Sequence, residues 1–122
     1  MSDTLVQKLM KRPCITLDEN SFIKNLVDIL NHNKVGCAVV TSLKFDYPVG
    51  IVSERDLIRN YEKIINDKNT KVKDVMTKNI IFCNKNTSSK ELMEIMSENK
   101  IRHIPIIEDH KLLGIVSIGD VV

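Results

Sequence analysis

An internal repeat constrains this chain more than any other feature of its sequence. Val75-Met76-Thr77 follows Leu9-Met10-Lys11 at an offset of 66 residues, and the stretch 87–100 follows the stretch 21–34 at the same offset. With 122 residues the chain fits one compact domain and leaves no room for two large ones. We therefore expect two copies of one small supersecondary unit that must pack together.

The ends of the two copies match at a slightly different offset. Gly50-Ile51-Val52-Ser53 recurs as Gly114-Ile115-Val116-Ser117, 64 residues later. The first copy therefore holds two extra residues, and we place them in the loop 43–48, because loops absorb insertions at little cost.

Each copy is expected to form a short leading helix and then a β-α-β-β-α unit, from apolar periodicity and turn residues. In the first copy we expect a helix at 4–10, an extended segment at 14–17, a helix capped by Ser21, strands at 37–41 and 49–52, and a last helix from Ser53 to about Ile65. In the second copy we expect a helix at 72–76, an extended segment at 80–83, a helix capped by Thr87 or by the box Ser88-x-x-Glu91, and strands at 104–107 and 112–116.

These elements predict a mixed α/β (α+β) fold. Repeat 1 covers residues 1–65, a polar linker covers 66–71, and repeat 2 covers 72–122. One such unit of roughly 55 to 60 residues buries too little surface to be stable alone. We expect the repeats to be related by a pseudo-twofold axis and packed sheet against sheet, with a small-molecule cleft between them.

Bulk composition excludes several classes of function. The chain is 43% hydrophobic and 28% charged, with a net charge of +2, so nothing favours a nucleic-acid or membrane partner. No secretory signal or long apolar run is visible, and we expect a cytoplasmic protein. Cys14, Cys37 and Cys83 stand in apolar contexts and are interpreted as small buried hydrophobes, not as disulfide partners or metal ligands.

A short polar motif follows the last strand of each copy. Gly50-x-x-Ser53-x-x-Asp56 recurs as Gly114-x-x-Ser117-x-x-Asp120. A carboxylate there can accept hydrogen bonds from both hydroxyls of a ribose, and the backbone amides of the helix's first turn favour an anion. The same pattern is also an ordinary helix cap, and one residue can serve both purposes. Two copies at matching repeat positions favour a ligand site.

These residues resemble a known family. The chain is similar to a tandem CBS-domain pair, also called a Bateman module, of the small stand-alone bacterial type. The resemblance spans nearly the whole chain and rests on Val75-Met76-Thr77, Ile101-Arg102-His103-Ile104-Pro105-Ile106, Leu113-Gly114-Ile115-Val116-Ser117 and Gly50-Ile51-Val52-Ser53-Glu54-Arg55-Asp56-Leu57.

The resemblance implies a regulatory module that binds AMP, ADP, ATP, NAD(H) or S-adenosylmethionine, usually as a homodimer. It implies that ribose is bound by Ser53, Asp56, Ser117 and Asp120; phosphate by Arg55, Arg102 and His103; and adenine by Thr77, Ile80, Ile81, Phe82 and Pro105. Guanidinium groups bind phosphate oxygens through two hydrogen bonds, which supports the arginines in that role. AMP is the first expectation, followed by ATP, ADP and NADH.

The two copies differ around the motif. Arg102-His103 stands where the first copy has Gly36-Cys37, and Gly119 stands where the first copy has Arg55. We expect one site to bind well and the other weakly or not at all. The sequence stops at Val122, where the family continues into a helix, so either it is trimmed or its last helix is missing.

Two further classes of function stay open at this stage. A module that serves only dimerisation or partner docking would have degenerate ligand sites, and the two intact motifs argue against it. An enzyme would need a nucleophile, a base and a group that orients the base, and no such set is visible. We therefore expect no catalytic activity and no catalytic cofactor.

Overall fold

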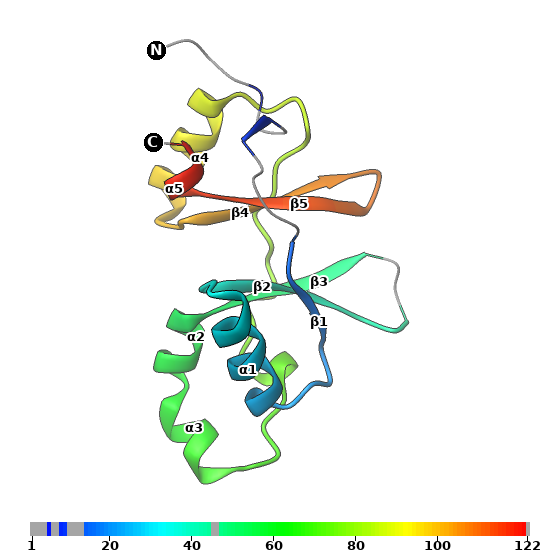
Figure 1. The fold of residues 1–122 in the computed structure, drawn as a ribbon, viewed down its shortest axis with the longest axis vertical. Helices are drawn as coiled ribbons and strands as arrows, with labels where there is room; N and C mark the ends of the chain where they lie inside the picture. Colours follow the sequence, from blue (N-terminus) through cyan, green and yellow to red (C-terminus); the bar gives the residue numbers. More distant parts are fainter. Residues whose placement is uncertain (1–4, 6–7, 10–13, 45–46, 122) are drawn as a thin grey trace. The chain divides into compact units, whose positions relative to one another are not determined.

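The structure, a computed structural model, describes residues 5, 8–9, 14–44 and 47–121 (Figure 1). The chain divides into two compact units. The 15–80 unit holds Ile15–Ile80, and the 81–122 unit holds the rest of the described chain, including the residues before Ile15. Leu5 of this N-terminal segment forms an isolated antiparallel bridge with Ser88.

A three-stranded sheet forms the centre of the 15–80 unit. Its strands are β1 (Thr16–Asp18), β2 (Cys37–Thr41) and β3 (Pro48–Ser53), and its helices are α1 (Ile23–Asn33), α2 (Glu54–Arg59) and α3 (Tyr61–Asn66). The strand order is β1-β2-β3, with β1 parallel to β2 and β2 antiparallel to β3. The antiparallel β2-β3 hairpin is joined by a loop, whereas the parallel β1-β2 pair needs α1 as its crossover.

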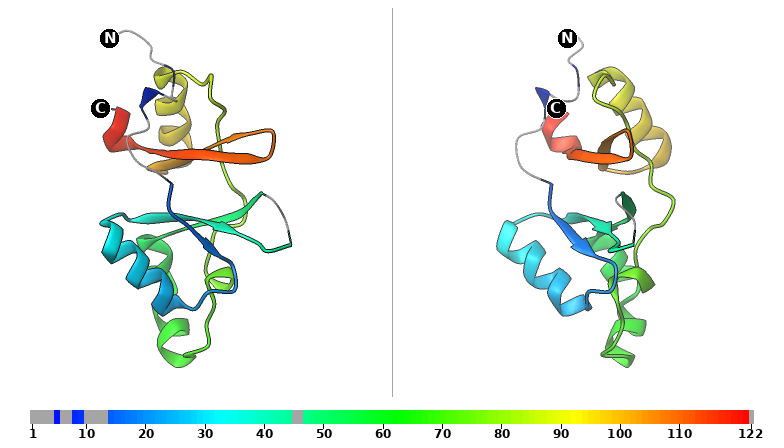
Figure 2. Two further views of the ribbon diagram at one scale, coloured as in Figure 1. Left: turned by 45° about the vertical axis from the view of Figure 1, so that its right-hand side comes forward. Right: turned by 90° about the vertical axis from the view of Figure 1, so that its right-hand side faces the viewer.

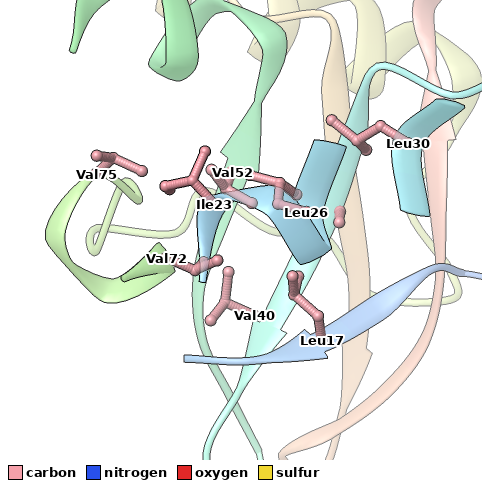
Figure 3. Close-up of a cluster of buried hydrophobic side chains, with 9 residues drawn as sticks. Leu17, Ile23, Leu26, Leu30, Val40, Val52, Val72 and Val75 are labelled. Atoms are coloured by element: carbon pink, nitrogen blue, oxygen red, sulfur yellow. The ribbon is translucent and has the colours of Figure 1, made fainter. Parts of the chain in front are cut away.

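The core of the 15–80 unit forms where α1 covers one face of the sheet (Figure 2). Ile23, Leu26 and Leu30 recur at helical spacing in α1 and are buried. Val40 of β2 and Val52 of β3 are fully buried against them (Figure 3). The apolar periodicity of the sequence therefore predicts the buried residues of α1, whereas Phe22 and Val27, which belong to the same apolar pattern, are 45% and 37% exposed.

The start of the second sequence copy also packs in this core. Val72 in the 3-10 helix η2 (Val72–Asp74) is fully buried, and Val75 is 5% exposed (Figure 3). The Val72 N–H donates to the Ser21 carbonyl at 2.8 Å, and the Lys73 N–H donates to the Glu19 carbonyl at 2.9 Å. The compact units therefore do not coincide with the sequence repeats.

The 81–122 unit has the same plan with fewer strands. It contains α4 (Ser89–Asn99), β4 (His103–Glu108), β5 (Lys111–Ser117) and the short α5 (Ile118–Val121). β4 and β5 are antiparallel. The turn between them places Asp109 and His110 at positive φ, as a tight two-residue hairpin requires. Leu92 and Met96 of α4 pack on Ile104, Ile106 and Val116.

The mixed α+β fold is confirmed. The strands expected at 37–41, 49–52, 104–107 and 112–116 are β2, β3, β4 and β5, with ends that agree to within two residues. The extended segment expected at 14–17 overlaps β1, whereas in the one expected at 80–83 only Cys83 pairs, in an isolated bridge with Ile106. The leading helix expected at 72–76 is the shorter 3-10 helix η2, and that expected at 4–10 falls largely outside the described residues. No helix in the described part of the chain has the length and apolarity to cross a membrane.

Two of the expected helix starts shift by one residue. Phe22, not Ser21, occupies the N-cap of α1, and its N–H donates to the Asn25 side chain at 3.3 Å. Ser88, not Thr87, caps α4, and its hydroxyl accepts from the Glu91 N–H at 3.2 Å. The alternative capping box Ser88-x-x-Glu91 is therefore the correct one.

The long helix expected after Ser53 is broken in two. Asn60 lies between α2 and α3, and its side-chain amide donates to the Asp56 carbonyl at 2.7 Å. Asparagine competes in this way for backbone hydrogen bonds and is a poor residue for a helix interior. The break leaves Ile58, Tyr61 and Ile65 at least half exposed, at 75%, 62% and 56%.

Truncating the centre of the 15–80 core should destabilise the protein strongly. Leu26 is fully buried, so Leu26→Ala should lower the free energy of unfolding by about 2–5 kcal/mol in urea denaturation. Val27 is next to it but 37% exposed, so the matched variant Val27→Ala should change stability by less than about 1 kcal/mol. Equal losses in the two variants would contradict this description of the core.

Candidate functional site

The motif of the first copy lies where β3 runs into α2. Ser53 ends the strand and is the N-cap of α2, and Asp56 is the third residue of that helix. The Ser53 N–H donates to Asp56 Oδ2 at 2.8 Å, and the Ser53 hydroxyl lies 3.2 Å from the same oxygen. The carboxylate therefore satisfies a backbone donor at the helix start, as the capping interpretation predicts.

The second copy has the same geometry at the junction of β5 and α5. The Ser117 N–H donates to Asp120 Oδ2 at 2.9 Å, and the Ser117 hydroxyl lies 3.0 Å from that oxygen. Both serines and both aspartates are half-buried. The repeated motif therefore forms the same hydrogen-bonded helix cap in both compact units.

In both motifs the cap uses one carboxylate oxygen and leaves the other available. Asp56 Oδ1 has one weak partner, the Thr77 hydroxyl at 3.4 Å. Asp120 Oδ1 has no hydrogen-bond partner among the described residues. An ionised carboxylate offers about four acceptor positions, so each aspartate can cap its helix and still accept hydrogen bonds from a ligand.

The Thr77 hydroxyl lies near Asp56 because the chain after η2 pairs with β3. Thr77 and Ile51 exchange both backbone hydrogen bonds, at 2.8 and 3.0 Å, in an isolated antiparallel bridge. Thr77 comes from the second sequence copy, yet it completes the surroundings of the first motif within the 15–80 unit. The structure therefore brings Ser53, Asp56 and Thr77 close together within the 15–80 unit.

Gly50 makes this approach possible. A Cβ on Gly50 would lie 2.5 Å from the Met76 sulfur, so that side chain would have to shift, and 3.0 Å from the Thr77 carbonyl oxygen, which is a tight contact with backbone. Sequence reasoning noted the glycine without assigning it this role. The available signal was the repeat itself, since Met10 and Gly114 stand at the matching positions of the other copy.

A second glycine lies under an acidic side chain. The Glu54 N–H donates to the Gly36 carbonyl at 2.9 Å. A Cβ on Gly36 would lie 3.3 Å from both Cδ and Oε1 of Glu54, so the carboxylate rests directly on this residue. Arg55, the expected phosphate ligand, follows on α2 with an exposed side chain. Sequence reasoning missed Glu54, because the direction of an exposed side chain leaves no trace in the pattern.

The cationic residues of the 81–122 unit lie beside its motif. His103 pairs with Ser117 across β4 and β5, and the Arg102 carbonyl accepts from the Ile118 N–H at 2.8 Å. Arg102 is exposed and His103 is half-buried. Both residues therefore lie next to Ser117 within this unit.

The expected adenine contacts are divided between the units. Thr77 and Ile80 belong to the 15–80 unit, whereas Ile81, Phe82 and Pro105 belong to the 81–122 unit. Phe82 is 55% exposed. Pro105 is buried, and its carbonyl accepts from the Cys83 N–H at 3.0 Å. Thr77 is bridged to Ile51 of β3, and Pro105 pairs with Ile115 of β5, so these two lie beside the strands that carry the motifs.

The described cysteines have the properties of structural residues. Burial raises the pKa of the Cys14 thiol from 9.0 to about 11. Burial likewise raises the pKa of Cys83 to about 11, against the opposing effect of a hydrogen bond with Thr87. A nucleophile or metal ligand needs a lowered thiol pKa. Within the described residues, no three His, Cys, Asp or Glu side chains gather as a metal site.

Comparisons with known proteins identify close relatives. A family model described as CBS domain matches residues 6–63 and 72–122. The CBS domain-containing protein CBSX3, mitochondrial, of Arabidopsis thaliana is 41% identical over 97 residues, which are 75% of this chain and 46% of that protein. This chain therefore spans less than half the length of that relative.

Solved structures match over almost the whole chain. The CBS-domain containing protein ATU1752 from Agrobacterium tumefaciens gives a TM-score of 0.88 at 34% identity, over 97% of this chain and 96% of that one. The CBS domain protein PAE2072 from Pyrobaculum aerophilum, complexed with AMP, gives a TM-score of 0.87 at 28% identity, over 96% of this chain and 89% of that one. The resemblance inferred from the sequence is confirmed.

Adding a methyl group at Gly50 should disturb the site and the fold together. Gly50→Ala should lower the free energy of unfolding by about 1–3 kcal/mol, because Met76 and the Thr77 backbone must move. In Gly119→Ala the nearest atom would be Ser117 Oγ at 3.6 Å, so this matched variant should be neutral or slightly stabilising. A neutral Gly50→Ala would contradict the close approach.

The raised thiol pKa values predict slow alkylation. At pH 8 a thiol with pKa about 11 holds roughly one hundredth of the thiolate of a thiol with pKa 9.0, so Cys14 and Cys83 should react about a hundredfold more slowly in the native than in the denatured chain. Peptide-resolved mass spectrometry after iodoacetamide treatment measures both rates. Alkylation rates that agree in the native and the denatured chain would refute this prediction.

The raised pKa values also make the free energy of unfolding depend on pH. The contribution of the buried, protonated thiols is present below pH 9 and should be lost as the pH rises towards 11.

Proposed function

The chain belongs to the CBS-domain family, and from this premise we propose that it is a regulatory module that binds an adenine nucleotide at its two Ser-x-x-Asp motifs. AMP is the first candidate, followed by ATP, ADP and NADH. The module reports the nucleotide by binding it and catalyses no reaction. A cytoplasmic homodimer is part of the same proposal.

The observation that carries the proposal is the available oxygen in each motif. Asp56 and Asp120 are both fixed by the same cap, and both keep acceptor capacity on Oδ1. Two adjacent ribose hydroxyls match one carboxylate, and charge-assisted hydrogen bonds contribute about 1.5–3 kcal/mol each. Because the cap holds each carboxylate in place before the ligand arrives, little conformational entropy is lost on binding.

AMP stands first because of a relative. PAE2072, which is complexed with AMP, is 28% identical to this chain over 96% of its length. In the proposal, Ser53, Asp56, Ser117 and Asp120 bind ribose; Arg55, Arg102 and His103 bind phosphate; and Thr77, Ile80, Ile81, Phe82 and Pro105 contact adenine. Arginine suits phosphate because its planar guanidinium donates two parallel hydrogen bonds.

A second candidate function is protein association without a ligand. Ile58 of α2 and Tyr61 and Ile65 of α3 are exposed apolar side chains, at 75%, 62% and 56% exposure. Such side chains are common where proteins meet. This observation favours a dimerisation or interaction module and is compatible with nucleotide binding.

The test removes the motif carboxylates while keeping their caps. Asn keeps an oxygen for the serine N–H but loses the charge, so Asp56→Asn with Asp120→Asn should fold and fail to bind. AMP at about 100 times its dissociation constant adds roughly 2.7 kcal/mol of stability, so the melting temperature of the wild type should rise by several degrees. The double variant should show no rise.

The matched control is Asp74→Asn. Asp74 Oδ2 accepts the Lys71 N–H at 2.9 Å and caps η2 as Asp56 caps α2, but it lies outside the motif. This variant should keep the full AMP response. A double variant that responds to AMP like the wild type would contradict the proposed site. If no adenine nucleotide shifts the melting temperature of ligand-free wild type, the association function is favoured.

A further inference from the structure

The two motifs are alike in their caps but differ in the charge beside them. In the 15–80 unit, the Glu54 carboxylate rests on Gly36, with Cδ and Oε1 3.3 Å from the position of a Cβ on that glycine. Gly36 directly precedes β2, and its carbonyl accepts the Glu54 N–H. The negative charge of Glu54 therefore lies near the start of β2 and the start of α2, next to Ser53. We call this place the charged edge of the motif.

The 81–122 unit reverses this charge. Arg102 stands at the position of Gly36, and its carbonyl accepts the Ile118 N–H at 2.8 Å, which is the same backbone hydrogen bond. Ile118 stands at the position of Glu54. The second unit thus has an arginine where the first has the glycine under Glu54, and an isoleucine where the first has Glu54 itself.

The neighbouring helix residues do not cancel the difference. Arg55 follows Glu54 in the first unit, so the positions 36, 54 and 55 sum to zero charge. In the second unit Gly119 stands at the position of Arg55, so Arg102 leaves the corresponding three positions at +1. His103 replaces Cys37 next to this edge and adds a further group that can carry positive charge.

We propose that Glu54 is a specificity-determining residue that weakens anion binding at the Ser53/Asp56 motif, so that an anionic nucleotide occupies the Ser117/Asp120 motif more tightly. This inference rests on the proposed function and adds to it the order of occupancy and the charge preference of each site. The cap contacts of the two units are nearly the same, at 2.8 and 2.9 Å, whereas the charges beside the caps differ.

Electrostatics gives the direction and the size of the effect of Glu54 and Arg102 on AMP affinity. A phosphate is repelled by Glu54 and attracted by Arg102, whereas a neutral nucleoside responds to neither charge. Glu54 and Arg102 are both exposed, so solvent and salt weaken the effect. Removing one such charge should change AMP affinity by about twofold to fivefold. Adenosine affinity should stay unchanged.

Isothermal titration calorimetry of the full chain tests this inference by measuring the affinity for AMP and for adenosine when only one motif is intact. In an Asp120→Asn background only the Ser53/Asp56 motif is intact, and Glu54→Gln should strengthen AMP binding by about twofold to fivefold. In an Asp56→Asn background only the other motif is intact, and Arg102→Gln should weaken AMP binding by a similar factor. Without further changes, the Asp56→Asn chain should bind AMP more tightly than the Asp120→Asn chain.

Glu62→Gln supplies the matched control, because it removes the same charge from the neighbouring helix α3 and should leave AMP affinity unchanged. The inference is overturned if the two single-motif chains bind AMP equally, or if Glu54→Gln changes AMP and adenosine affinity alike. Wild type that binds none of AMP, ATP, ADP and NADH overturns the proposed function itself, and this inference with it. Binding that is present but symmetric overturns only the inference.

Discussion

The close approach of the chain at Met76 and Thr77 to the backbone of Gly50 and Ile51 organises the 15–80 unit. The backbone bridge between Ile51 and Thr77 ends a segment whose earlier part, η2, fills the core under α1. It also brings the Thr77 hydroxyl to Asp56. One steric condition, the absence of a side chain at Gly50, therefore underlies the packing, the boundary of the unit and the surroundings of the motif.

The aspartate of each motif serves the fold before any ligand arrives. Asp56 and Asp120 accept the N–H of the serine that begins each short helix, and Leu57 and Val121 of these helices pack against the two cores. This double use explains why the cap and ligand interpretations of the sequence are compatible. It also means that an alanine at either position would mix a loss of stability with a loss of binding, whereas asparagine separates the two.

Much of this fold can be predicted from the sequence, because apolar periodicity and repeat spacing fix the strands, α1, α4 and the place of both motifs. The misplaced details depend on competition between polar groups over short distances. Asn25 provides the cap acceptor that makes Phe22 the start of α1, and Asn60 breaks the last helix of the first copy. The position of Glu54 over Gly36 is a tertiary contact of an exposed side chain with a half-buried glycine, which no sequence pattern records.

The central claim is that the two motif carboxylates bind the sugar of an adenine nucleotide. Its most direct test is a titration of the isotope-labelled chain with AMP, followed by amide resonances in two-dimensional NMR. The account predicts saturable shifts concentrated at 53–56 and 117–120 and at Thr77, with those at 117–120 saturating first. Saturable shifts elsewhere, with these amides unmoved, would contradict it.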